Sequence, residues 1–290
     1  MFKGSFVALA TPFKKGKVDE KAYRALIEFQ IKNGTDGIVP CGCTGEAATL
    51  SIEEQKSVIK IALETIGKRA KVVAGTGSNC THEAMELTMF AKKAGCDGAL
   101  IITPYYNKPT PEGQYRHYRD IAEKSQLPIM LYNVPSRTGL CLSPETVARL
   151  SKVENIVAIK EAAGSVQQVM DIISLCDITV MSGDDAMTLP FMAVGAMGVV
   201  SVVANIIPDK IHKLTKNYLD GKIDSAKKVH YEILGLVKAM FIETNPIPVK
   251  TALSLMGMIG EEWRMPLCEM MPENRAKLRD VLVKYGLIRK

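Results

Sequence analysis

The chain has 290 residues, of which 47% are hydrophobic and 6% aromatic, and its formal net charge is +6. This length allows one large core, and α/β barrels of this size often form a single domain. Lysines and arginines are spread along the chain without a basic run, and few aromatic side chains are available to stack on bases. We therefore expect neither a nucleic-acid partner nor a charged membrane surface.

The seven cysteines are scattered and odd in number, which argues against a disulfide framework and fits a reducing compartment. We therefore predict a cytoplasmic protein. Cys41 and Cys43 form a C-x-C pair, but no second pair of cysteines or histidines completes a zinc spacing, so no metal site is expected. No run of about 20 apolar residues indicates a membrane span. Met1–Ser5 leads directly into a strand pattern, without the apolar region of a secretory signal.

Eight short apolar runs rich in valine and isoleucine alternate with helical patterns, as strands buried on both faces do. The predicted strands are Phe6–Ala10, Gly37–Cys41, Val72–Gly75, Gly98–Ile102, Ile129–Tyr132, Ile156–Lys160, Ile178–Ser182 and Gly198–Val203. Eight such units favour an α/β fold of the (β/α)8 barrel type. A doubly wound open sheet is the alternative, but it normally carries a phosphate loop. Gly75-Thr76-Gly77 follows a strand, and residue 80 is a cysteine where that loop needs a third glycine.

Helix start signals separate the predicted strands, namely Ser51 before two glutamates, Pro111, and Ser143 before a proline. Residues 1–221 form the predicted (β/α)8 catalytic barrel. Residues 222–290 form a predicted C-terminal helical subdomain, with helices expected around 222–243, 246–257 and 272–285. Because no Gly/Ser linker separates the two parts, we expect the helices to pack onto the barrel as an extension.

Lys160 stands near the end of the predicted buried strand Ile156–Lys160. Burial disfavours the charged form of a lysine and can lower its pKa by several units. A free amine on a rigid element is what Schiff-base chemistry requires. A lysine in this position could also extend its amine into solvent from the barrel end, which is the alternative explanation.

Other chemically useful groups follow the strands at the same predicted barrel end, where barrel enzymes carry their active sites. Two glycines in Gly42–Glu46 free the backbone to bind an anion beside the Thr44 hydroxyl. The remaining candidates are Tyr105, Tyr106, Tyr132, Arg137, Gly183 and Val200. An amine, phenols, a backbone anion site and a guanidinium together suit a 2-oxo acid and a second carboxylate.

Two further features have competing explanations. Lys250 is a rival nucleophile, but it follows a proline-rich turn in the helical extension, away from the strand ends. Asp184 and Asp185 could bind a metal, but no partner set of histidines and carboxylates is apparent. We predict instead that they cap the helix that follows.

Five segments carry a family resemblance, in order and with similar spacing along essentially the whole chain. They are Gly42–Glu46, Thr103–Pro109, Tyr132–Gly139, Ile159–Ala162 and Asn245–Lys250. They resemble the dihydrodipicolinate synthases, also called 4-hydroxy-tetrahydrodipicolinate synthases, which belong to the pyruvate-dependent class I aldolases. The tyrosine and lysine are shared by that wider superfamily and imply imine chemistry. Ser136-Arg137-Thr138-Gly139 is more specific to the synthases.

The resemblance implies a role for each candidate residue. Lys160 forms an imine with pyruvate, so that no other cofactor is needed, and Tyr132 donates and accepts protons. Thr44 and the main chain of Val200 lie at the pyruvate carboxylate, and Arg137 binds the carboxylate of L-aspartate 4-semialdehyde. The product, 4-hydroxy-tetrahydrodipicolinate, enters lysine and diaminopimelate synthesis. The resemblance also implies a homotetramer of two tight dimers, in which Tyr106 joins a proton relay in a neighbouring subunit.

Cys43 departs from the family pattern, which has a threonine of the proton relay at this position. A thiol is a weaker hydrogen-bond donor than a hydroxyl, so the departure bears on turnover. The resemblance also implies a lysine effector site in a cleft at the dimer interface. Its residues match Ala48, Asn79, Glu83 and Tyr105, whereas Ile52 and Gln55 replace histidines of some lysine-sensitive relatives.

Two other functions remain open at this point. One is a pyruvate aldolase acting on a 2-keto-3-deoxy sugar acid or on an N-acetylneuraminate-type substrate. The other is a barrel that binds or regulates and has lost catalysis, for which Cys43 is the only support.

Overall fold

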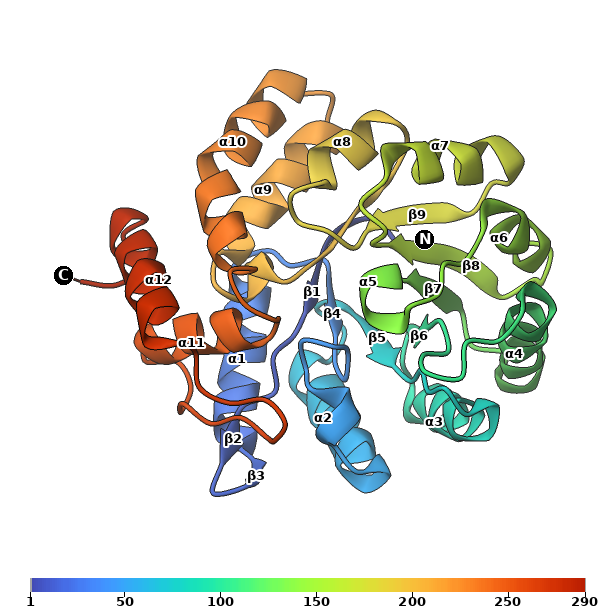
Figure 1. Ribbon diagram of the computed structural model, residues 1–290, viewed down its shortest axis with the longest axis horizontal. Coiled ribbons are helices and arrows are strands. Elements are labelled where there is room, and N and C mark those ends of the chain that lie inside the picture. The colour runs from blue at the N-terminus through green and yellow to red at the C-terminus, as the bar shows by residue number, and fades with distance from the viewer. Residues whose placement is uncertain (1, 290) are drawn as a thin grey trace.

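The computed structural model describes residues 2–289, and its centre is a closed barrel of eight parallel strands (Figure 1). The barrel strands are β1 (Gly4–Ala8), β4 (Gly37–Val39), β5 (Lys71–Gly75), β6 (Gly98–Ile102), β7 (Ile129–Asn133), β8 (Ile156–Glu161), β9 (Thr179–Ser182) and β10 (Gly198–Ser201). β1 closes the barrel by pairing with both β4 and β10. The predicted (β/α)8 barrel is confirmed, and the open-sheet alternative is wrong.

All eight predicted strands are present, but several end earlier than predicted. β4 stops at Val39, and Cys41 has a φ of 56°, which an extended strand cannot contain. β10 stops at Ser201, and the chain continues into the short helix η2 (Val203–Asn205). At these points the chain turns off the barrel to build loops, although its residues remain apolar.

Helices surround the barrel and connect its strands. They are α1 (Glu20–Lys32), α2 (Ile52–Ile66), α3 (Thr81–Ala94), α4 (Pro111–Ser125), α6 (Pro144–Leu150), α7 (Val166–Leu175), α8 (Thr188–Ala193) and α9 (Pro208–Leu219). Smaller elements lie in the loops, namely the hairpin of β2 (Phe13–Lys14) and β3 (Lys17–Val18), η1 (Ala47–Thr49) and α5 (Pro135–Thr138). The predicted start signals are confirmed, because Ser51 and Ser143 cap α2 and α6, and Pro111 opens α4.

Three C-terminal helices lie together on one side of the barrel, near α1 and α9 (Figure 1). They are α10 (Ile223–Ala239), α11 (Ile247–Leu255) and α12 (Pro272–Lys284). Their buried residues, such as Leu236, Leu253 and Leu278, belong to the same hydrophobic cluster as Val7 of β1. The helices therefore share a core with the barrel. The division between residues 221 and 222 stays a prediction, and its outer bounds, residues 1 and 290, lie outside the described residues.

A second hydrophobic cluster fills the inside of the barrel, where alternate residues of each strand point. Met130 and Tyr132 of β7 belong to it, as does Ala158 of β8. Because side chains alternate along a strand, Lys160 points into the barrel on the same face as Ala158. The register pairs Lys160 with Tyr132 of the neighbouring strand. A lysine and a tyrosine thus meet at the carboxyl end of the barrel.

Among residues 2–289, no helix is both long enough and apolar enough to cross a membrane.

Candidate active site

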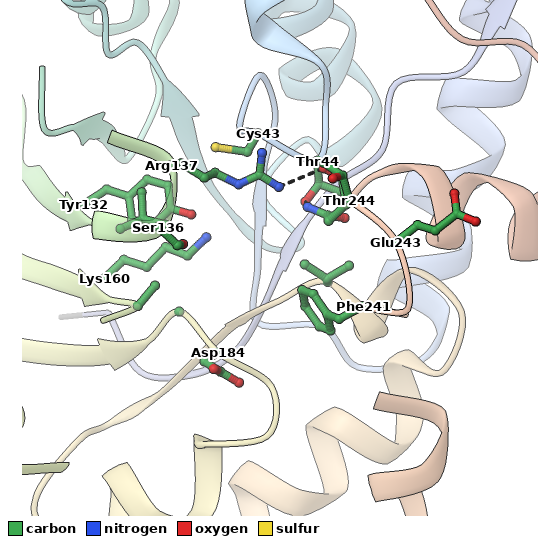
Figure 2. A pocket seen from close by; sticks show the side chains of 15 residues that line it. Cys43, Thr44, Tyr132, Ser136, Arg137, Lys160, Asp184, Phe241, Glu243 and Thr244 are labelled. Atoms are coloured by element: carbon green, nitrogen blue, oxygen red, sulfur yellow. Dashed lines mark hydrogen bonds between the residues drawn. The ribbon is translucent and has the colours of Figure 1, made fainter. Parts of the chain in front are cut away.

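The Lys160 side chain lies at the base of a pocket at the carboxyl end of the barrel (Figure 2). Lys160 is only 5% exposed, and its Nζ is 4.2 Å from the centroid of the Tyr132 ring. Figure 2 shows the Lys160 amine pointing into the pocket, with the Arg137 guanidinium above it in this view. The alternative of an amine extending into bulk solvent is therefore wrong.

Burial lowers the pKa of the Lys160 amine from its ordinary value of 10.5 to about 8. Desolvation is the largest cause, and the Arg137 charge acts in the same direction. The nearby Cys43 and Asp185 raise the pKa and oppose the shift in part. With a pKa of about 8, roughly one tenth of the Lys160 amine is uncharged and nucleophilic at pH 7, and about half of it is uncharged at pH 8.

The pKa of the Tyr132 phenol is shifted in the opposite direction to that of Lys160. Burial raises its pKa well above 10, Cys43 contributes in the same direction, and the Arg137 charge opposes it. Tyr132 therefore keeps its proton at neutral pH and can donate it to a leaving oxygen. Cys43 is half-buried and lines the same pocket, which brings the three predicted groups Lys160, Tyr132 and Cys43 together.

Buried polar side chains hold the end of β8 in place. The Glu161 carboxylate, next to Lys160, accepts two hydrogen bonds from Asn133 Nδ2, at 2.9 and 3.1 Å, and one from Ala163 N at 2.7 Å. Burial raises the pKa of Glu161, and these hydrogen bonds oppose the shift. Strand β8 is thereby fixed to β7 directly after the Lys160–Tyr132 pair.

Gly183 follows β9 and lies beside the Lys160 side chain. A Cβ at this position would lie 2.7 Å from Ala162 Cβ and 3.0 Å from Lys160 Cε, too close for either contact. The absence of a side chain is therefore what allows Lys160 to extend across residue 183 into the pocket. Sequence reasoning placed Gly183 at the site, but this close approach becomes visible only in three dimensions.

The pocket has a volume of about 560 Å³ and is lined by groups from both parts of the chain. The barrel contributes Cys43, Thr44, Tyr132, Val134, Ser136, Arg137, Lys160, Ala162, Gly183, Asp184 and Val202. The segment before α11 contributes Phe241, Glu243, Thr244 and Asn245, and Figure 2 shows the first three on the opposite side of the pocket from Lys160. A cavity of this size, with an amine, a phenol and a guanidinium, is suited to small carboxylate substrates.

Asn245 links two of the predicted substrate-binding residues, although sequence reasoning gave it no role. Its Nδ2 donates to Thr44 Oγ1 at 3.0 Å, and its main-chain oxygen accepts from Arg137 Nη2 at 2.7 Å. Asn245 belongs to the Asn245–Lys250 segment, which was part of the family resemblance. That segment was the available signal, but nothing local in it indicates contact with a loop two hundred residues away.

Two predicted site residues lie outside the pocket. The Tyr106 side chain is 90% exposed, and its φ is 67°. It does not line the pocket of its own chain. Val200 is buried in the inner barrel cluster beneath the site, and Val202 is the residue of this segment that lines the cavity.

The predicted capping role of the two aspartates is wrong. Helix α8 begins after Met187 and has no side-chain cap. The buried Asp185 turns the other way and accepts hydrogen bonds from Ser201 Oγ, from Val202 N at 2.9 Å and from Val203 N at 3.3 Å. Asp185 thereby joins the end of β9 to the loop after β10. Burial raises the pKa of its carboxyl group to about 6.

The prediction that Lys250 lies away from the strand ends is also wrong. Sequence reasoning placed it away from the strand ends, whereas its Nζ donates to Glu46 Oε1 in the loop after β4. Lys250 is 1% exposed and lines neither the pocket at Lys160 nor the neighbouring cavity. It has no access to a substrate, so the rival nucleophile is excluded on geometric grounds.

A neighbouring cavity of about 570 Å³ contains most of the residues of the predicted effector site. Ala48, Glu83 and Tyr105 line it, together with Ile52 and Gln55. Asn79 is not among its lining residues, although its main-chain oxygen accepts from Asn107 Nδ2 at 2.9 Å. Cys43, Tyr132 and Arg137 line both cavities, so the two adjoin at the candidate catalytic groups.

The model of the dihydrodipicolinate synthetase family matches residues 1–285. The chain belongs to this family. It is 56% identical, over 291 residues, to the 4-hydroxy-tetrahydrodipicolinate synthase of Thermodesulfovibrio yellowstonii, and the match covers 100% of both chains. The predicted family and enzyme class, a lyase of the 4-hydroxy-tetrahydrodipicolinate synthase type, are confirmed.

Solved structures of dihydrodipicolinate synthases have the same fold. The Aquifex aeolicus structure matches with a TM-score of 0.98 and 49% identity, over 100% of both chains. The Cyanidioschyzon merolae structure, which was solved with lysine bound, matches with a TM-score of 0.96 and 38% identity, over 99% of both chains. These relatives support the synthase interpretation and not the sugar-acid or N-acetylneuraminate alternative.

We expect the rate of imine formation to rise with pH in parallel with the fraction of Lys160 that has lost its proton. Quenched-flow measurements at subsaturating pyruvate, with borohydride as the quench, should show a rate that rises about tenfold per pH unit below pH 8 and levels off above it. Asp185→Asn removes a carboxylate that raises the pKa of Lys160, so the midpoint should move to lower pH. Asp184→Asn at the rim is the matched control, and an equal midpoint in both variants would contradict this assignment.

Proposed function

We propose that the chain condenses pyruvate with L-aspartate 4-semialdehyde to form 4-hydroxy-tetrahydrodipicolinate, the first committed step of lysine and diaminopimelate synthesis. The observation that carries this proposal is the buried Lys160 amine, with its lowered pKa, lying 4.2 Å from the ring centroid of a protonated tyrosine. Membership of the synthase family supports the choice of substrates.

The first step forms the imine. The neutral Lys160 amine attacks the ketone carbon of pyruvate, and the resulting carbinolamine loses water. Tyr132 lies where a proton is needed for the departing hydroxyl group, and its raised pKa keeps that proton available. The carbon–nitrogen bond to the enzyme carries the reaction, so the proposal needs no other cofactor. Thr44 and the main chain near Val200 are assigned to the pyruvate carboxylate.

The second step joins the two substrates. Loss of a proton from the pyruvate methyl group converts the imine to an enamine, whose carbon attacks the aldehyde carbon of the semialdehyde. We assign Arg137 to the semialdehyde carboxylate, because its guanidinium lines the same pocket as Lys160 and a guanidinium can donate paired hydrogen bonds to a carboxylate (Figure 2). The product then cyclises and leaves, which returns Lys160 to the free amine.

We also propose a homotetramer in which Tyr106 completes the proton relay of a neighbouring subunit. In support of this, Tyr106 is 90% exposed and does not line the pocket of its own chain. A tyrosine so exposed at the end of a barrel strand is available to a second chain. A cytoplasmic location accords with the seven cysteines, all of which are free thiols.

The neighbouring cavity is our candidate site for lysine as an effector. Glu83 offers a carboxylate to an ammonium group, and it already accepts from Ser78 Oγ at 2.7 Å. Tyr105 and Ala48 complete the walls, and we retain Asn79 at the margin. The lysine-bound relative supports this assignment. Because Cys43 and Tyr132 line both cavities, an occupant here would lie against the proposed proton relay.

The synthase reaction is tested by coupling the chain to dihydrodipicolinate reductase with both substrates. We expect turnover by the unmodified chain and a borohydride-stable pyruvate adduct on Lys160. Arg137→Ala should still trap pyruvate but lose turnover about a hundredfold, because a charge-assisted contact worth roughly 2–3 kcal/mol is removed. Arg116→Ala, on the exposed face of α4, is the matched control. A chain that traps pyruvate but does not turn over the semialdehyde would contradict the proposed second substrate.

Replacing Cys43 by threonine tests the relay. The hydroxyl is a better donor and acceptor than the thiol, so Cys43→Thr should raise turnover while the half-saturating pyruvate concentration changes little. Cys80→Thr, at an exposed site after β5, controls for the loss of a thiol. Unchanged or lower turnover would show that the hydroxyl relay does not limit the rate.

Lysine binding is tested by calorimetry and by rate measurements up to millimolar L-lysine. We expect heat of binding together with a falling rate, and loss of both in Glu83→Gln. Glu86→Gln, one turn further along α3 and outside the cavity, should behave like the unmodified chain. No heat and no loss of rate in the unmodified chain would reject the effector site.

A further inference from the structure

The buried ion pair between Glu46 and Lys250 is not used by the chemistry proposed above. Lys250 is on α11 of the C-terminal subdomain, and Glu46 is in the loop between β4 and α2. Their side chains are 1% and 0% exposed, although the residues are 204 positions apart in the chain. The pair is therefore a buried bridge between the C-terminal helices and one loop of the barrel.

The loop that contains Glu46 also presents two of the pocket residues. Thr44 and Cys43 line the pocket two and three residues before Glu46. Glu46 N donates to Cys43 O at 3.1 Å, so the carboxylate is held only one turn away from the residues in the pocket. A shift of Glu46 would therefore move Cys43 and Thr44 with it.

The backbone of this loop needs external support. Glu46 has a φ of 52° and a ψ of 38°, the left-handed conformation that glycine adopts readily and other residues do not. Such a conformation costs about 1–3 kcal/mol and persists where surrounding contacts fix it. Lys250 Nζ and Arg264 N, which lies 3.3 Å from Glu46 Oε2, provide those contacts.

Other contacts from the C-terminal region hold the same loop. Asn245, five residues before Lys250, donates to Thr44 Oγ1 at 3.0 Å. Arg264 Nη1 donates to Thr49 O at 2.8 Å, at the far end of the loop. Both cations contact the Phe13 ring, whose centroid is 4.3 Å from Lys250 Nζ and 4.4 Å from Arg264 Cζ. The loop is thus held near its start, middle and end.

Stability alone is a poor explanation for the ion pair. Taking two charges out of water costs several kcal/mol each, and apolar side chains of similar volume often replace a buried pair without loss. A buried ion pair does impose direction, because the two charges must meet with defined geometry. A loop whose position matters for binding benefits from that constraint.

We propose that the Glu46–Lys250 pair positions the Cys43–Thr44 segment for the pyruvate carboxylate. Glu46 and Lys250 are therefore positioning residues, because they contact each other but do not line the pocket at Lys160. This inference rests on the proposed function, because it assigns the segment to pyruvate. It predicts that breaking the pair weakens pyruvate binding more than it affects the chemical step.

The test measures the pyruvate concentration that gives half-maximal borohydride trapping on Lys160. Lys250→Met removes the cation at similar length. Half-saturation should rise about tenfold, the loss expected for one charge-assisted contact, while the maximal trapped fraction is kept. Lys210→Met, which breaks the exposed Lys210–Glu232 pair between α9 and α10, is the matched control and should leave half-saturation unchanged.

A double variant separates positioning from stability. Glu46→Gln together with Lys250→Met leaves no unpaired buried charge, so the melting temperature should recover toward that of the unmodified chain. Half-saturation should stay raised, because the directional contact is still missing. If Lys250→Met alone does not fold, the double variant provides the test of the positioning role. Lys250→Arg keeps the cation and should restore part of the binding.

The outcomes distinguish three cases. Raised half-saturation in the double variant, with a recovered melting temperature, supports the positioning role. Unchanged half-saturation in folded protein would overturn that role and leave the pair a structural contact. If the unmodified chain traps no pyruvate at all, the proposed function itself is overturned, and the role assigned to the pair is overturned with it.

Discussion

The burial of the Lys160 amine is the constraint on which the rest of the site depends. Inside the barrel the charged form is disfavoured, and the change in its pKa from 10.5 to about 8 corresponds to roughly 3 kcal/mol. The folded chain binds fewer protons than the unfolded chain between these two values. This group therefore makes folding less favourable below about pH 8 than above pH 10.5. Reactivity at Lys160 and a local cost in stability have the same cause.

The neighbouring elements accommodate that buried amine. Strand pairing sets Lys160 against Tyr132, whose ring faces the cation and whose phenol keeps its proton. Gly183 leaves space for the lysine side chain, and Asp185 provides a compensating carboxylate while it holds the loop after β10. These residues come from the ends of three neighbouring strands, β7, β8 and β9, which is how a closed parallel barrel concentrates chemistry at one rim.

The barrel does not build the pocket alone. The segment before α11 forms one wall, and Asn245 contacts both the Thr44 hydroxyl and the Arg137 guanidinium. Together with the Lys250–Glu46 bridge, these contacts tie the C-terminal helices to the loop after β4. The continuous core agrees with this, because helices α10 to α12 bury their apolar faces in the same cluster as the barrel. The extension therefore contributes to the site as well as to packing.

Sequence predicted best what depends on neighbours along the chain. Apolar runs of strand length were enough to place all eight strands, and Lys160 stood out because a lysine near the end of such a run is unusual and costly to bury. Asp185 was assigned to the wrong partner, since helix capping is the local role of an aspartate and its actual partners are on the next strand. Lys250 was judged remote because its sequence position gives no sign of Glu46.

The sequence by itself predicted the barrel fold, the lysine that supplies the buried amine, and the family. These predictions rest on apolar runs and short motifs, which consist of residues that are neighbours along the chain. Only the tertiary structure decided which groups face Lys160, how exposed Tyr106 is outside the pocket of its own chain, and that the C-terminal segment completes the site. These depend on register, barrel closure and contacts between residues up to about two hundred positions apart. No local pattern encodes such contacts, because a polar side chain can pair with many different groups. Which of these groups lies beside it is decided only when the chain folds.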